Sequence, residues 1–143
     1  MKFLDANVFI YAYYKPKRKL TGKEGKLKEE AKKIIRNISL GKEEVVTTVI
    51  HLSEIVNILK HGMTPRELTD FILNLYILDN LKIHGVSEAE YFAATELAAD
   101  LKIDPNDALA IDFMRRNGIE KIYSFDKDFE GKEGIKRLPN LES

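Results

Sequence analysis

Residues 3–10 read FLDANVFI, and one carboxylate, Asp5, lies in the middle of this apolar run. Apolar side chains flank it on both sides: Phe3, Leu4, Val8, Phe9 and Ile10. A carboxylate among such neighbours costs free energy unless a cation or hydrogen bonds compensate its charge. Two roles are therefore open for Asp5. It either caps a helix that begins at Ala6, or it belongs to a charged functional site.

The composition indicates a globular protein. The chain has 143 residues, of which 44% are hydrophobic and 32% charged, so we expect a single domain over residues 1–143. The absence of cysteine excludes disulfides and thiolate metal sites. Because no apolar stretch is long enough to cross a bilayer and Lys2 opens a poor signal peptide, we expect a cytoplasmic protein without membrane contact.

The charge is unevenly distributed along the chain. The formal net charge is zero, but residues 15–33 contain nine lysines or arginines and only three glutamates, a local net charge of +6. The remaining residues must then sum to −6. Such a basic segment usually forms a solvated connection, although it can also attract RNA without sequence preference.

Short apolar runs alternate with helical patterns. Strands are predicted at Lys2–Asp5, Glu44–Thr48, Leu81–His84, Lys121–Phe125 and Ile135–Leu138. Helices are predicted at Ala6–Tyr14, at Leu27–Leu40, at Val49–His61 with Ile50, Ile55, Ile58 and Leu59 buried, and after the capping residues Thr64, Ser87 and Asp104. This alternation favours an α/β fold with a mostly parallel sheet and helices on both faces.

In such a sheet, ligands bind beyond the carboxyl ends of the strands, where the strand order reverses. Asp5 lies at the carboxyl end of the first predicted strand, and Ser124 and Asp126 lie at the end of the fourth. If these two strands are central neighbours, both acids meet at one edge of the sheet.

Other acids at element boundaries have simpler explanations when each is taken alone. Glu54 fits the solvent-facing side of its helix, and Asp107 fits the first turn of a helix capped by Asp104. Asp126 and Asp128 fit an ordinary turn after a strand.

Taken together, these acids indicate a metal site. Crowded carboxylates repel one another unless a cation neutralises them, and a cluster of oxygen ligands suits Mg²⁺ or Mn²⁺ rather than zinc. The histidines show no metal-ligand spacing, because His51 and His61 are ten positions apart. One or two divalent ions in such a cluster can activate water for attack on a phosphodiester.

Four stretches of the chain, in order, resemble the four acidic motifs of the PIN domain. They read FLDANVFIYA, SEIVNIL, DPNDALAIDFMRRNG and IYSFDKDFE, and they span Phe3 to Phe129. Within that family the pattern is most similar to VapC-type toxins. The resemblance implies a three-layer α/β/α fold with a parallel sheet of about five strands in the order 3-2-1-4-5. It also implies a Mg²⁺- or Mn²⁺-dependent endoribonuclease that acts on single-stranded or structured RNA, with an antitoxin as partner.

The resemblance also implies the site residues. By position, the catalytic and metal-binding acids are Asp5, Glu54, Asp107 and Asp126. The supporting residues are Asn7 and Ser124, with Asp128 as an additional acid.

Two surface features suggest contacts with other molecules. Tyr11, Tyr13 and Tyr14 precede the basic segment and can stack on single-stranded bases, although such a cluster is more often core or dimer contact. The apolar residues around Phe71–Leu78 exceed the needs of one core, so a homodimer is expected.

Three alternatives to a nuclease remain open. A receiver-like signalling module usually has an acidic pair after the first strand, but Leu4 and Ala6 flank Asp5 here. A haloacid-dehalogenase-like phosphatase needs an acid two residues after its nucleophile, where this chain has Asn7. A noncatalytic binding domain would tolerate loss of any of the four acids except for effects on stability.

Overall fold

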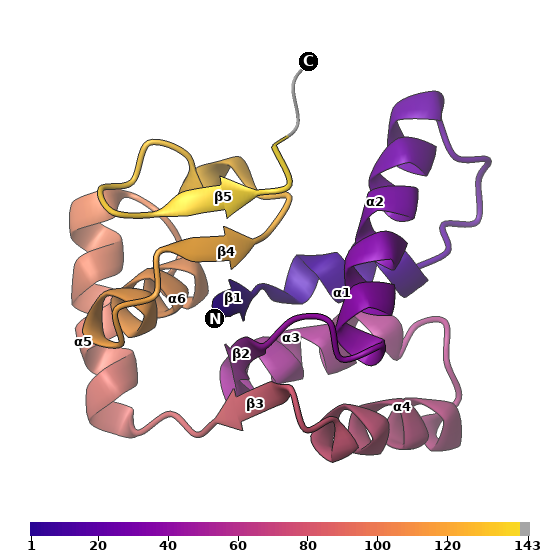
Figure 1. Cartoon of the computed structure of the whole chain (residues 1–143), viewed down its shortest axis with the longest axis horizontal. Coiled ribbons are helices and arrows are strands. Elements are labelled where there is room, and N and C mark those ends of the chain that lie inside the picture. Colours follow the sequence, from indigo (N-terminus) through magenta and orange to yellow (C-terminus); the bar gives the residue numbers. More distant parts are fainter. Residues whose placement is uncertain (141–143) are drawn as a thin grey trace.

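The computed structural model describes residues 1–140, which form one sheet with helices on both sides (Figure 1). The strands are β1 (Lys2–Leu4), β2 (Val45–Thr48), β3 (Leu81–His84), β4 (Lys121–Tyr123) and β5 (Lys136–Leu138). The helices are α1 (Ala6–Tyr13), α2 (Gly22–Ser39), α3 (Val49–Leu59), α4 (Pro65–Ile77), α5 (Glu88–Leu101) and α6 (Pro105–Arg116), with a 3₁₀ turn η1 (Lys127–Phe129). The last three residues of the predicted domain, 141–143, lie outside the described part.

All strand pairs are parallel, and the strand order is β3-β2-β1-β4-β5, as predicted. In the centre, Phe3 of β1 pairs with Val46 of β2 on one side and with Ile122 of β4 on the other. Strands β2 and β3 lie on one side of β1, and β4 and β5 lie on the other, so the strand order reverses between β1 and β4. The carboxyl ends of these two strands are therefore the expected ligand site. The order also differs from the 2-1-3-4-5 order of flavodoxin-like folds, which counts against the receiver-like alternative.

Alternate residues of each central strand enter two separate hydrophobic cores. Leu4 packs into the core formed with α1, α2, α3 and α4, while Phe3 packs into the core formed with α6. Figure 1 shows α5 and α6 on one side of the sheet and the other helices on the opposite side. Because both faces are covered at the centre of the sheet, β2 and most of β1 are buried on both faces, as central parallel strands usually are.

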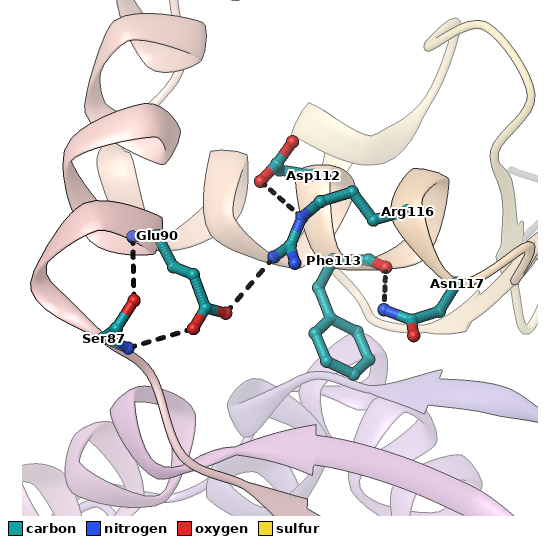
Figure 2. A network of polar contacts seen from close by, with 6 residues as sticks. All are labelled: Ser87, Glu90, Asp112, Phe113, Arg116 and Asn117. Atoms are coloured by element: carbon teal, nitrogen blue, oxygen red, sulfur yellow. Dashed lines mark hydrogen bonds and ion pairs between the residues drawn. The ribbon is translucent and has the colours of Figure 1, made fainter.

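Helices α5 and α6 are held together by a polar network (Figure 2). Ser87 and Glu90 form a capping box at the start of α5, and Glu90 also accepts a 3.4 Å hydrogen bond from Arg116 at the end of α6. Arg116 also donates from Nε to Asp112, at 3.0 Å. The start of α5 therefore lies beside the end of α6, so the first turn of α6 lies at the opposite end of this helix pair.

Several predicted boundaries were wrong. The helix predicted from Leu27 begins at Gly22, because Thr21 and Glu24 form a capping box ahead of it. The strands predicted to end at Asp5 and Phe125 end instead at Leu4 and Tyr123. The last strand, predicted to begin at Ile135, begins at Lys136. Among residues 1–140, no helix combines the length and apolar character needed to cross a bilayer.

The predicted burial of α3 was wrong at two positions. Ile55 and Leu59 are buried, as predicted, but Ile58 is 38% exposed and Ile50 is only half-buried. Both lie on sides of α3 that point away from the centre of the core.

Candidate active site

Asp5 is held in a buried position between β1 and β4. Its backbone N–H donates to the carbonyl of Tyr123 at 3.0 Å, which extends the pairing of the two strands by one residue. The hydroxyl of Ser124 donates to Asp5 Oδ2 at 2.6 Å, and both residues are buried. Asp5 is the N-cap residue of α1, but its side chain makes no capping hydrogen bond, so the capping alternative does not explain the buried carboxylate.

The segment after β4 is fixed by side-chain hydrogen bonds. The backbone N–H of Phe125 donates to Asn7 Oδ1 at 3.2 Å, and that of Asp126 donates to Ser124 Oγ at 3.0 Å. Asp126 in turn accepts a 2.9 Å hydrogen bond from the backbone N–H of Asp128. Asp126 therefore forms the turn predicted for it after the fourth strand. The same turn places its carboxylate at the edge of the sheet that holds Asp5.

Helix α3 contributes Glu54 and a buried histidine. His51 Nε2 donates to the backbone carbonyl of Asn106 at 3.1 Å, and Nδ1 accepts from the Thr48 hydroxyl at 2.7 Å. Burial lowers the pKa of His51 to about 4, so the ring is neutral at physiological pH. Ligand atoms of Asp5, His51 and Glu54 lie within 4.8 Å of one another, but the two hydrogen bonds already occupy both ring nitrogens of His51.

Helix α6 contributes Asp104 and Asp107 from its first turn. Asp104 Oδ1 accepts a 2.9 Å hydrogen bond from the backbone N–H of Asp107 and so caps the helix. The side chain of Asp107 is buried, and its Oδ2 has no hydrogen-bond partner among the described residues. Carboxylate oxygens of Asp104, Asp107 and Asp128 lie within 4.8 Å of one another.

The surroundings of three acids at this edge favour their protonated forms. Burial raises the pKa of Asp5 to about 6, although the Ser124 hydrogen bond opposes this, and Asp126 adds repulsion. Burial followed by the charge of Asp5 raises the pKa of Glu54 to about 7. Burial followed by the charges of Asp5, Asp104 and Asp126 raises the pKa of Asp107 to about 9. A cation among these groups would reverse each shift.

The donor set fits a hard divalent cation. Carboxylate oxygens from β1, α3, α6 and the turn after β4 converge, and an orphaned buried oxygen, such as Asp107 Oδ2, costs free energy unless something binds it. Oxygen-rich sites of this type suit Mg²⁺ or Mn²⁺.

The structure brings the predicted residues into one neighbourhood. Asp5 interacts with Glu54, Asp107 and Asp126 through their charges, and Asp128 lies beside Asp107. Asn7 and Ser124 support Asp5 and the turn through the hydrogen bonds described above. Glu54 was predicted on the solvent-facing side of its helix, but it is half-buried, whereas Ser53 and Asn57 of the same helix are exposed.

Sequence reasoning missed Asp104 as a member of the site and the contact that His51 makes beside it. Asp104 was taken only as a helix cap, although its spacing of three residues from Asp107 places both acids on the same turn. His51 lies beside the site in a structural role, with both ring nitrogens bonded within the protein. Its position three residues after Thr48 and three before Glu54 was the available signal, because residues at this spacing lie on one side of a helix.

Comparisons with known proteins agree with this fold. The family model of the PIN domain matches residues 2–134. No curated protein sequence matches the chain.

Three solved structures have similar folds. One is a toxin-antitoxin complex from Klebsiella pneumoniae, at 15% identity over 95% of this chain and 96% of that chain, with a TM-score of 0.65. Another is VapC20 of Mycobacterium tuberculosis, a sarcin-ricin loop cleaving toxin, at 18% identity over 94% and 98%, with a TM-score of 0.66. The third is VapBC2 from Rickettsia felis bound to a DNA fragment from its promoter, at 16% identity over 95% and 96%, with a TM-score of 0.62.

Proposed function

Because the chain belongs to the PIN domain family, we propose that it is a metal-dependent endoribonuclease and the toxin of a toxin-antitoxin pair. The observation that carries this proposal is the convergence of Asp5, Glu54, Asp107 and Asp126 at the carboxyl ends of β1 and β4. The similar folds of a sarcin-ricin loop cleaving toxin and of a toxin-antitoxin complex support it. The substrate is single-stranded or structured RNA.

These four acids would hold Mg²⁺ or Mn²⁺, with Asp107 Oδ2 as the oxygen that most needs a partner. When bound, such an ion supplies positive charge that stabilises charge developing on the phosphate oxygens, and it lowers the pKa of water. The structure of this edge suits that chemistry, because the carboxylates are held by the protein before any ligand arrives.

The surrounding residues hold the acids in place. Ser124 donates to Asp5 and so favours its charged form, which is the form that binds cations. His51 joins α3 to the first turn of α6, which keeps Glu54 and Asp107 at a set separation.

The proposed partners are an RNA substrate, an antitoxin and a second copy of the chain. Residues 15–33, with their local charge of +6, would attract RNA. The helix predicted to form the dimer exposes Leu73, Tyr76 and Ile77, but Phe71 packs on rings within its own chain. The homodimer and the cytoplasmic location stay predictions.

The test is cleavage of labelled RNA, one single-stranded and one hairpin, by the purified protein with Mg²⁺, with Mn²⁺ and with EDTA. We expect cleavage with either ion and none with EDTA. Asp5→Asn should abolish cleavage while its circular dichroism spectrum stays that of the wild type. Full activity of Asp5→Asn would refute the assignment of the site.

The same assay also tests the alternative that the chain is a noncatalytic binding domain. If the wild type cleaves neither RNA with either ion, and alanine at any of the four acids changes only stability, then the chain is a binding domain and the nuclease proposal is wrong.

A further inference from the structure

A cavity of about 300 Å³ lies outside the acidic edge and has no role in the site described above. It is formed by the second half of α1, the connection to α2 and the first turns of α2. The aromatic and charged side chains of its lining are Tyr11, Tyr14, Arg18, Glu24 and Lys28. Its size is at the lower end of the range for small-molecule pockets.

The cavity is linked to the acidic edge through one aromatic contact. The ring of Tyr11 packs on the ring of Phe125, with the centroids 5.1 Å apart. Phe125 lies between Ser124 and Asp126 in the chain, and its backbone N–H binds Asn7. Tyr11 also belongs to α1, the helix that begins directly after Asp5.

The lining offers planar groups for stacking. Tyr11 and Tyr14 are 38% and 44% exposed, so a ligand can reach both rings. Arg18 donates two hydrogen bonds to Glu24, at 2.7 and 2.6 Å, which hold the guanidinium as a flat group at the edge of the cavity. Aromatic rings and guanidinium planes are the surfaces on which bases of single-stranded nucleic acids stack.

The one carboxylate of the lining, Glu24, is paired with Arg18, which leaves Lys28 without a carboxylate as hydrogen-bond partner among the described residues. Lys28 donates to the backbone carbonyl of Tyr14 at 3.1 Å rather than to a carboxylate. Burial followed by the charges of Lys32 and Lys15 lowers the pKa of Lys28, so these three ammonium groups repel one another. An anion such as a phosphate would relieve this repulsion.

We propose that this cavity binds one base of the RNA substrate on Tyr11 and Tyr14, while Lys28 and its neighbouring lysines bind the adjoining phosphates. The proposal rests on the proposed function, because it takes the bound RNA to be the substrate of the acidic edge. An acidic peptide would satisfy the lysines but would leave the stacking surfaces unused, so the nucleic acid is the better match.

The test measures binding of a short, fluorescently labelled single-stranded oligoribonucleotide of mixed sequence by anisotropy, in EDTA so that the RNA stays intact. Tyr14→Leu should weaken binding by about tenfold, since stacking on one ring contributes about 1–3 kcal/mol. Tyr14→Phe keeps the ring and should bind as the wild type does. Tyr76→Leu, the same change at an exposed tyrosine on α4, is the matched control and should also bind normally.

Salt dependence separates stacking from charge. Tyr14→Leu should weaken binding equally at every salt concentration. Lys28→Gln should instead reduce the slope of log K against log[salt] by about 0.7, the value for one contact to a single-stranded phosphate.

Three outcomes would overturn the proposal: no binding of the RNA by the wild type, equal affinity of Tyr14→Leu, or displacement of the RNA by polyglutamate as effectively as by unlabelled RNA. The result is independent of the cleavage assay. If Tyr14 governs RNA binding but the wild type cleaves nothing, the cavity proposal stands and the nuclease proposal fails.

Discussion

The pKa values of carboxylates are shifted in opposite directions at the two ends of the sheet. At the amino end, Glu43 precedes β2 and lies 2.6 Å from both Lys2 Nζ and the Tyr123 hydroxyl. Burial alone would raise the pKa of Glu43, but these two partners hold it below its usual range. At the carboxyl end, Asp5 and Asp107 lie among other acids, and their pKa values are raised.

This difference separates a structural carboxylate from candidate functional ones. Glu43 is satisfied by the protein itself, and it ties β1, β2 and β4 together. The acids at the carboxyl end make the folded chain less stable when they are charged, a cost that a ligand of opposite charge would offset. The comparison therefore predicts that changes at the two ends act in opposite directions on stability, and that only changes at the carboxyl end lower cleavage.

The largest expected effect comes from removing the Asp107 carboxylate at the carboxyl end of the sheet. Asp107→Asn should lower RNA cleavage at least about a hundredfold, because it removes an oxygen that would hold the metal. It should also stabilise the metal-free protein by at least about 1 kcal/mol, because it removes a carboxylate with a raised pKa. Thermal unfolding in EDTA and the cleavage assay measure the two effects.

Glu43→Gln is the matched change at the amino end. It should destabilise the protein by about 1 kcal/mol, because it weakens charge-assisted hydrogen bonds from Lys2 and Tyr123, and it should leave the cleavage rate unchanged. A loss of cleavage in Glu43→Gln equal to that in Asp107→Asn would remove the distinction between the two ends.

The pH dependence of stability sharpens the comparison. A carboxyl group with a raised pKa keeps its proton in the folded state where the unfolded chain has lost it, so stability falls as pH rises towards the folded pKa. Between about pH 6.5 and pH 9, the metal-free protein should lose about 3–4 kcal/mol of stability, most of it through Asp107 and the rest through Glu54. His51 is neutral in the folded protein throughout this window.

Chemical denaturation at several pH values in EDTA measures this slope. Asp107→Asn should flatten it, and Glu43→Gln should leave it as in the wild type. A stability that stays level or increases over this window would mean that the acids are less crowded than the structure indicates.

A smaller effect is expected from Ser124→Ala. The mutation removes the hydrogen bond that favours the charged form of Asp5, so the pKa of Asp5 should rise further. Cleavage at mildly acidic pH should fall by about tenfold, which corresponds to one hydrogen bond to a charged group, and should recover as pH increases. A uniform loss at every pH would instead indicate that the turn around Asp126 had moved.

Much of the fold could be predicted because its signals are local. Short apolar runs set the strands, and Thr64, Ser87 and Asp104 mark helix starts through their own caps. The start of α2 was missed, since Gly22 and Gly25 are poor helix formers and the capping box at Thr21 decides the boundary.

The parts of the site that the sequence did not reveal depend on contacts between distant segments. His51 reaches Asn106, 55 residues away in the chain, and no local pattern encodes that bond. Asp104 was hidden for another reason: its role as a helix cap is sufficient to explain it, and only the folded chain brings it beside Asp128. Asp5 and Ser124 could be placed because each directly follows a strand.

The most direct test of the central claim, that the acids at the carboxyl end share a divalent cation, is calorimetric titration of Mn²⁺ into the metal-free protein at about pH 7. In buffers of different ionisation enthalpy, we predict saturable binding to the wild type with release of protons, since Asp107 and Glu54 must lose theirs to bind a metal. Asp107→Asn should abolish this binding and Glu43→Gln should preserve it. Absence of Mn²⁺ binding in the wild type, or equally tight binding by Asp107→Asn, would contradict the claim.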